Sequence, residues 1–271
     1  MSNLVSRLRK NVWKTPGFKQ LRQSPRINAL LGTGYGTHWG LFTSSQEAQE
    51  YLRASIRSTY NNDAIVKFNI DQYYGIKIYD WPVLFFLQDL LTRNELRTVT
   101  DFGGHVGVKF YAYRELLGFP ADFQWQVFDL PAMIAEGRRR LPPEEHALRF
   151  FDDLESTRPS DVMIFSGVLQ YLDSSIQEML DRLPSRPSMI ILNKVAVHDT
   201  ESFYTLENYG NHWLAYHVVT LKDLEESRTA LGYELVSSWT VPREITVNSA
   251  RGRRTVRTIG QVWRRSATAA G

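Results

Sequence analysis

The sequence predicts an α/β fold built on a mixed, mostly parallel sheet with helices on both faces. From residue 97 onward, short apolar runs alternate with amphipathic runs, a pattern typical of such a sheet. Near the end, two β-rich runs follow each other without a helix between them, which predicts a hairpin and an antiparallel last strand. With 271 residues and 43% apolar content, the chain is long enough for one such domain and a small additional segment. We therefore expect a seven-stranded mixed sheet.

Each element is predicted from its own run of residues. Strands are expected at 97–102, 124–129, 148–151, 161–166 and 188–195. Helices are expected near 107–117, 131–139, 174–183 and 221–231. The last two strands correspond to GYELVSSWTV and TVRTIGQVWRR, which are joined by a basic turn containing Gly252.

Residues 1–92 are expected to form a mainly helical cap or lid, and residues 93–271 the sheet domain. In the cap, Ser44 precedes a run with apolar residues at helical spacing, which predicts an N-capped helix. A second helix is predicted from Pro82 to about residue 91, with the proline in its first turn. The glycine-rich stretch LGTGYGTHWG at 31–40 has no clear strand before it or helix after it, and is therefore predicted to be a flexible loop.

Composition excludes several classes of protein. Without cysteine, the chain has no disulfide, thiolate metal site or cysteine nucleophile, and no His or carboxylate spacing predicts a metal. The net charge of +3 does not call for a nucleic-acid partner. No secretory signal or membrane-length apolar run is present, so we expect a cytoplasmic protein. Basic clusters in residues 1–26 and 251–265 favour a solvated face, with a peripheral membrane or RNA contact as the alternative.

The stretch DFGGHVG lies between a predicted strand and a predicted helix, where open α/β sheets bind ligands. Glycines there let the backbone touch a ligand, although they can equally serve tight strand-to-helix packing. The dinucleotide fingerprint G-x-G-x-x-G fails, because His105 and Val108 occupy its second and third glycine positions counted from Gly103. An oxidoreductase that uses a dinucleotide is therefore disfavoured.

A looser pattern, an acid followed by glycines at alternate positions, fits Asp101, Gly103 and Gly107, with His105 at the remaining point and Gly104 inside the turn. Here the sequence resembles the S-adenosylmethionine-dependent methyltransferases with a Rossmann-like sheet, whose seventh strand is likewise antiparallel and arrives through a hairpin. Their cofactor has an ammonium, a carboxylate and a sulfonium but no phosphate. An acid and free backbone groups near the turn suit that chemistry.

The resemblance extends to three further strand ends and covers about residues 95–265. The segments WQVFDLP, RFFDDLE and DVMIFSGVLQYLDS look like those of small-molecule O-methyltransferases, and the chain also resembles a largely uncharacterised bacterial methyltransferase-like family. The resemblance implies Asp129 with Leu130 for the ribose, Asp152 with Asp153 for the adenine amino group, and Ser166 with Gly167 for the floor of the pocket. Each acid has the alternative role of a helix N-cap.

The proton acceptor is less clearly marked. In the resembling O-methyltransferases a histidine follows the fourth strand, but this chain has Gln170 there, which can orient a hydroxyl and cannot take its proton. His198, just after the fifth strand, is our first candidate for the base, and a structural role for it is equally expected. Tyr171 is a further candidate catalytic residue. His212 and His217 are alternative bases and His105 lies nearer the cofactor turn, with a structural role favoured for all three; Glu207 and Tyr209, like Tyr171, are candidates to line an acceptor site.

The resulting hypothesis is an S-adenosylmethionine-dependent methyltransferase that acts on an oxygen of a small molecule or a saccharide unit. The alternative keeps the fold without the catalysis: a cofactor-sensing or partner-binding protein, suggested by Gln170 and the basic termini. The acceptor, the methylated element and the oligomeric state are left open by the sequence.

Overall fold

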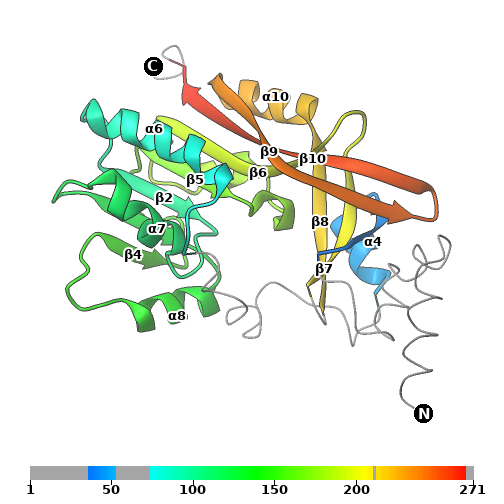
Figure 1. The fold of residues 1–271 in the computed structure, drawn as a ribbon, viewed down its shortest axis with the longest axis horizontal. Coiled ribbons are helices and arrows are strands. Elements are labelled where there is room, and N and C mark those ends of the chain that lie inside the picture. The colour runs from blue at the N-terminus through cyan, green and yellow to red at the C-terminus, as the bar shows by residue number, and fades with distance from the viewer. Residues whose placement is uncertain (1–35, 53–73, 210–211, 267–271) are drawn as a thin grey trace, which may run out of the picture.

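The computed structural model describes residues 36–52, 74–209 and 212–266, which form a ten-stranded mixed sheet flanked by helices (Figure 1). The strands are β1 (His38–Phe42), β2 (Thr98–Phe102), β3 (Gln124–Phe128), β4 (Leu148–Phe151), β5 (Val162–Ser166), β6 (Met189–His198), β7 (Phe203–Tyr209), β8 (His212–Thr220), β9 (Tyr233–Ser249) and β10 (Gly252–Arg265). The helices are α4 (Ser45–Glu50), α6 (Trp81–Thr92), α7 (Val108–Leu117), α8 (Pro131–Arg140), α9 (Ile176–Asp181) and α10 (Leu221–Ala230), with 3-10 turns η2 (Ile78–Asp80) and η3 (Leu169–Tyr171).

The parallel part of the sheet has the order β4-β3-β2-β5-β6, with every neighbouring pair parallel. β10 pairs antiparallel with both β6 and β9. The predicted α/β class is therefore confirmed. The predicted count of seven strands is too low, because β1, β7 and β8 extend the sheet to ten.

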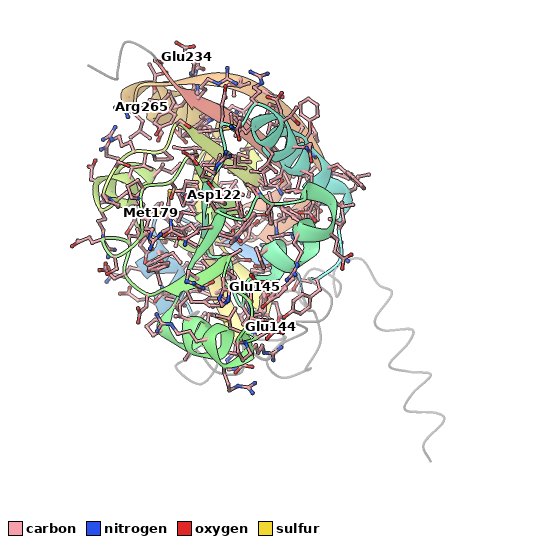
Figure 2. All side chains as sticks on the ribbon, turned by 90° about the vertical axis from the view of Figure 1, so that its left-hand side faces the viewer. Asp122, Glu144, Glu145, Met179, Glu234 and Arg265 are labelled. Carbon is pink, nitrogen blue, oxygen red and sulfur yellow. The ribbon has the colours of Figure 1, made fainter. Side chains whose placement is uncertain are left out.

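Alternating residues of the parallel strands divide the core into two layers. On β5, Val162 and Ile164 join the cluster beneath α6, α7 and α8, whereas Met163 and Phe165 face α9 and α10. A strand buried on both faces in this way reads as a continuous apolar run, as VMIF does here. Figure 2 shows side chains throughout these layers, with Glu234 and Arg265 at one end of the paired β9 and β10.

Six strands close into a ring beyond the parallel sheet. β6 pairs with β8, β8 with β7, β7 with β1, β1 with β9, β9 with β10, and β10 again with β6. The prediction of a flexible loop at 31–40 is wrong for His38–Gly40, which lies in β1; residues 31–35 lie outside the described ranges. Pairing with β7 and β9 makes this glycine-containing segment a strand, because tertiary context overrides its low local propensity.

The helix predicted from Pro82 is confirmed as α6. Its Val83, Leu84, Leu87 and Leu90 belong to the same buried cluster as the parallel strands, so α6 is part of the sheet's core rather than a lid. Upstream, Ser44 caps α4 by accepting a hydrogen bond from Glu47 N, and α4 ends at Glu50. A lid role for the rest of residues 1–92 stays a prediction. None of the described helices is long and apolar enough to span a membrane.

Candidate functional site

The turn from Gly103 to Gly107 joins β2 to α7 at the carboxyl edge of the parallel sheet. β2 has β3 on one side and β5 on the other, and chain connections diverge there in opposite directions, which is the usual place for a ligand crevice. A Cβ at Gly103 would lie 2.5 Å from Val168 Cγ2, and one at Gly104 would lie 2.7 Å from Asp101 Oδ2. The packing explanation holds for Gly107, whose Cβ would meet Leu148 Cδ2 at 2.8 Å. The glycines thus let the turn lie directly on Asp101 and the loop after β5.

Asp101 lies beneath this turn and is only 1% exposed. Trp125 Nε1 donates a hydrogen bond to its Oδ2 at 3.2 Å. Burial raises the pKa of Asp101 to about 7, while the bond from Trp125 and the charges of Lys109 and Lys194 act to lower it. Asp101 is therefore a buried acid that a cationic ligand group would hold ionised.

Asp129, directly after β3, is hydrogen-bonded to the glycine turn. Its Oδ2 accepts from His105 N at 2.8 Å and its Oδ1 accepts from Leu130 N at 2.7 Å. Burial raises the pKa of Asp129 to about 6, against the effect of these two bonds. The structure thus brings together Asp101, Asp129 and the turn, as the sequence predicts, and places His105 in the left-handed region at φ 57°.

The next strand end is arranged differently. Asp152 is exposed and lies 3.7 Å from Arg138 NH2. Asp153 accepts bonds from Glu155 N and Ser156 Oγ and pairs with Arg182 at 3.2 Å, and its hydrogen bonds lower its pKa. Asp153 thus caps the following turn, both acids also pair with arginines from other segments, and the adenine role of both residues stays a prediction.

The loop after β5 faces the same edge and lies against a half-buried lysine, Lys194. Ser166 Oγ accepts from Asn193 Nδ2 at 3.3 Å, and a Cβ at Gly167 would lie 2.8 Å from Lys194 Cε. Lys194 has φ 60°, and its Nζ lies 5.0 Å from the centre of the Tyr79 ring. Burial lowers the pKa of Lys194 to about 8. The sequence analysis missed this residue, although a lysine inside the apolar run ILNKVAV was a visible signal.

A second cation comes from the first turn of α7. Lys109 Nζ lies 2.7 Å from Asp80 Oδ1, and the Tyr113 hydroxyl donates to the same oxygen at 2.9 Å. Asp80 is fully buried and Lys109 is 7% exposed. Since Lys109 also lowers the pKa of Asp101, the ion pair belongs to the surroundings of the glycine turn.

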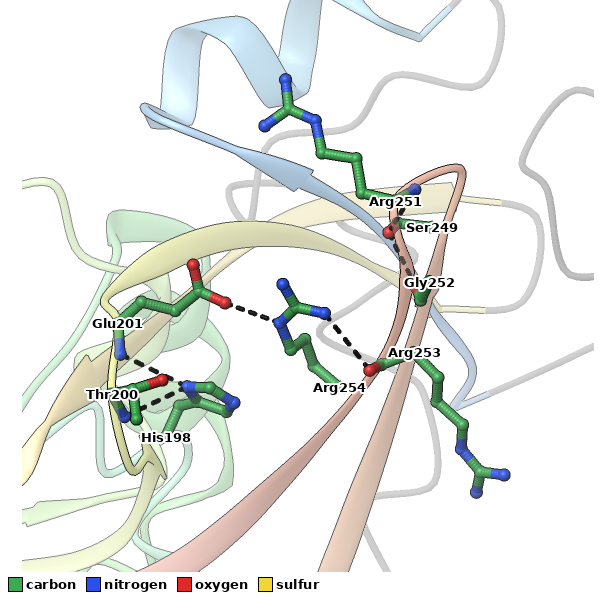
Figure 3. A network of polar contacts seen from close by, with 8 residues as sticks. All are labelled: His198, Thr200, Glu201, Ser249, Arg251, Gly252, Arg253 and Arg254. Atoms are coloured by element: carbon green, nitrogen blue, oxygen red, sulfur yellow. Dashed lines mark hydrogen bonds and ion pairs between the residues drawn. The ribbon is translucent and has the colours of Figure 1, made fainter.

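His198, the last residue of β6, lies away from this edge. Ser166 is in register with Asn193, so His198 is five residues, up to about 16 Å at roughly 3.3 Å per residue, beyond the end of β5. Its Nδ1 accepts from Thr200 N and Glu201 N, and Glu201 pairs with Arg254 at 2.6 Å (Figure 3). This geometry is that of a turn-stabilising histidine, and its role as a base stays a prediction.

Gln170 and Tyr171 lie in η3, close to the glycine turn. Gln170 is buried, and its Oε1 has no hydrogen-bond partner among the described residues. The Tyr171 hydroxyl donates to Glu207 Oε2 at 2.5 Å. Tyr171 also packs in the small cluster that contains Leu130 and Met133, just after Asp129.

Glu207 is the centre of a polar group that we call the ring cluster, consisting of His38, Tyr171, Glu207 and Arg243. His38 Nε2 and Arg243 NH2 each lie 3.8 Å from Glu207 Oε1. His38 and Arg243 escaped the sequence analysis, because β1 and β9 reach Glu207 only when the ring closes. The other histidine candidates lie elsewhere on β8, where His217 stacks on Tyr204 with 4.2 Å between ring centres.

Within the described ranges, no group of three or more His, Asp or Glu side chains is placed to hold a metal ion.

No protein-family model matches the sequence, and no curated protein does.

Several solved structures are similar to this chain. OxaC in complex with SAH and oxaline is 19% identical with a TM-score of 0.45, and the similar region covers 74% of this chain and 52% of the OxaC chain. LepI in complex with SAM is 14% identical with a TM-score of 0.47, and the similar region covers 68% of this chain and 46% of the LepI chain. A third structure is the Burkholderia thailandensis 1,6-didemethyltoxoflavin-N1-methyltransferase with bound S-adenosylhomocysteine. It is 15% identical with a TM-score of 0.42, and the similar region covers 79% of this chain and 94% of that enzyme. The chain spans about half the length of OxaC and LepI, and at this similarity the likeness carries no activity over to it.

Proposed function

We propose that this protein transfers a methyl group from S-adenosylmethionine to an oxygen of a small molecule or saccharide unit. Three features of the chain support the proposal: the glycine turn at the point where the sheet's connections diverge, the buried Asp101 and half-buried Asp129 beside it, and an antiparallel last strand that enters through a hairpin. The similar structures that hold SAM or SAH agree with it but do not carry it.

The residues at the turn fit the groups of this cofactor. Asp101 would pair with the ammonium, and the cations Lys109 and Lys194 flank the same edge, where a carboxylate needs them. A side chain at Gly104 would collide with Asp101, so glycine is needed for the turn to pack directly against this acid. When bound, the cofactor would supply a methyl group already activated by the sulfonium, so the chain's task is alignment and the exclusion of water.

The observation that carries the proposal is the position of the Asp129 carboxylate. Each oxygen accepts one backbone N–H, from His105 and from Leu130. An ionised carboxylate has about four acceptor sites, so two further donors can bind. Adjacent hydroxyls of a ribose are such a pair, and Asp129 already lies against the turn that would hold the rest of the nucleoside.

The test is calorimetric titration with S-adenosylhomocysteine. We expect the wild-type protein to bind it, and Asp129→Ala to weaken binding at least tenfold, which is about 1.4 kcal/mol. Asp122→Ala is the matched control, because Asp122 is an exposed acid paired with Arg97. An unchanged affinity in Asp129→Ala would remove the ribose assignment, and a wild-type protein that binds no S-adenosylhomocysteine would contradict the whole proposal.

The second candidate, a protein that binds the cofactor without using it, is favoured by one observation. Gln170 stands where the resembling enzymes have their base, and a glutamine cannot accept a proton. Tight S-adenosylhomocysteine binding, together with no transfer of labelled methyl to any acceptor, would favour this candidate. Competition by NADH for the same site would instead revive a dinucleotide enzyme.

A further inference from the structure

The ring cluster assembles polar side chains from four separate elements around two buried members, His38 and Glu207, with Arg243 exposed at its edge. Tyr171 comes from η3, Glu207 from β7, His38 from β1 and Arg243 from β9. His38 is 2% exposed and Glu207 is 4% exposed. Buried acids and histidines are costly unless their polar atoms are paired, so the cluster needs an explanation.

His38 is the member whose hydrogen bonds are incomplete. Neither ring nitrogen has a hydrogen-bond partner among the residues that the structure describes, and Nε2 is only within 3.8 Å of Glu207. Burial, with the charge of Arg243, lowers the pKa of His38 to about 3, so the ring is neutral and one nitrogen carries a lone pair. A buried polar atom left unpaired costs about 1–3 kcal/mol. The other nitrogen carries an N–H, and a ligand hydroxyl oxygen that accepts from it would remove the cost at that atom while leaving the hydroxyl proton free for another acceptor.

The cluster also lies next to the proposed cofactor edge. Tyr171 is four residues beyond Gly167, and Val168 between them touches the glycine turn at the Gly103 position. Tyr171 packs against the cluster of Met133 and Leu214, as Leu130 does, and it donates its hydroxyl to Glu207. Tyr171 therefore links the residues beside Asp129 to the carboxylate inside the ring.

We infer that Glu207 is the proton acceptor for methyl transfer and that the acceptor molecule carries an acidic hydroxyl, such as a phenol. The inference rests on the proposed function. As the hydroxyl proton passes to Glu207 Oε1, the acceptor oxygen attacks the methyl carbon. The carbon–sulfur bond breaks and its electron pair stays on sulfur, so the products are the methyl ether, S-adenosylhomocysteine and a protonated Glu207. His38 orients the hydroxyl, and Tyr171 and Arg243 are positioning residues that act through Glu207.

The charges around Glu207 suit this role. Burial raises its pKa, whereas the Tyr171 hydrogen bond and the Arg243 charge lower it; the other groups that face it are the neutral His38 and Tyr216 on β8. A base works best when its pKa approaches the operating pH. A phenol has a pKa near 10, so a carboxylate with a raised pKa can remove its proton during the reaction. An aliphatic alcohol is far less acidic and gives up its proton less readily.

The first experiment follows Glu207 itself, without any acceptor. Carbon-13 NMR of labelled glutamate carboxyls, with Glu207→Gln for assignment, should place its titration above the ordinary value of 4.5. Tyr171→Phe should move the titration to still higher pH, because it removes the bond that favours the carboxylate. Tyr204→Phe is the matched control on β7 and should leave it unchanged. A titration at or below the ordinary value would overturn the inference.

The second experiment offers catechol, resorcinol and a hydroxyquinoline to the protein with methyl-labelled S-adenosylmethionine. We expect methylation by the wild type, a loss of at least 100-fold in Glu207→Gln, and a shift of the acid limb of the pH profile to higher pH in Tyr171→Phe. In Glu207→Gln and Tyr171→Phe, affinity for S-adenosylhomocysteine should stay within threefold of the wild-type value. The control is Glu225→Gln, at an exposed position on α10, which should behave as wild type.

The outcomes separate the two proposals. If Glu207→Gln keeps its rate, or if the wild type methylates none of these phenols while still binding S-adenosylhomocysteine, the inference is wrong and the proposed function stands. If the wild type does not bind S-adenosylhomocysteine at all, both are wrong.

Discussion

Asp101, within β2, and Asp129, directly after the neighbouring β3, both lie beside the glycine turn, and burial raises the pKa of each above that of a surface acid. Burial raises the pKa of Asp101 to about 7 and that of Asp129 to about 6. Only the ionised form of Asp101 attracts an ammonium, and only the ionised form of Asp129 offers all its acceptor sites. Near neutral pH, small changes in pH therefore alter what this site can bind.

From these two residues we predict that affinity for S-adenosylhomocysteine falls as the pH is lowered through about 7, where Asp101 is protonated, and then through about 6, where Asp129 is protonated. Each raised pKa means that the carboxyl takes up a proton earlier than a surface acid does, and the proton displaces the ligand's donor. Calorimetry across this range should show both steps. Asp101→Asn should weaken binding and flatten the upper step, whereas Asp122→Asn should change neither. A pH-independent affinity in the wild type would contradict the assignment of Asp101.

At the scale of elements, α6 is attached to α7 through a buried ion pair as well as through apolar packing. Asp80, at the end of η2, accepts bonds from Lys109 and Tyr113 of α7 and from Lys77 N. Removing one partner of such a pair leaves an uncompensated buried charge. The pair therefore fixes the start of α6 beside the first turn of α7, which is the turn that follows Gly107.

We expect Asp80→Asn to lower the free energy of unfolding by about 3–5 kcal/mol, measured by urea denaturation. Adding Lys109→Met to the same chain should recover part of the loss, because the unpaired cation is then gone. Asp89→Asn, which breaks the surface pair with Arg93, should cost under about 1 kcal/mol. An Asp80→Asn protein as stable as the wild type would show that the pair contributes nothing to the attachment.

At the scale of the whole molecule, the parallel sheet and the ring are continuous because they share β6. Within the ring, β10 pairs with β6 from Met189 to Val197 and with β9, and β9 and β10 span 17 and 14 residues. The ring cannot separate from the parallel sheet without breaking the hydrogen bonds of β6. The ring cluster and the glycine turn are therefore held at a fixed distance by continuous backbone.

This continuity predicts a single cooperative unfolding transition, to be followed by circular dichroism and by tryptophan fluorescence. Ile245→Ala in the ring and Ile191→Ala in the parallel sheet, both buried, should each lower the stability by about 2–5 kcal/mol and shift the same transition by both probes. Two transitions, with Ile245→Ala moving only one of them, would show that the ring unfolds by itself.

The sequence alone determined the parallel strands, the helices α6 to α10 in outline, the glycine turn and the acids at the strand ends. Local patterns carry this information, because apolar periodicity and the glycines of DFGGHVG are readable within a few residues. The sequence did not reveal β1, β7 and β8. The segment around His38 contains glycines, and apolar and polar residues do not alternate regularly around Glu207. The preference of these segments for strand is supplied by their neighbours.

Tertiary structure decided which charged groups meet. Lys194 reaches the loop after β5 at Gly167 only because β6 neighbours β5, and His38 and Arg243 reach Glu207 only because six strands close into a ring. Residues far apart in the chain interact through space by burial and charge, and neither depends on sequence separation. The pattern of the sequence therefore fixed where a ligand edge would lie, while the closing of the ring placed a buried acid beside it.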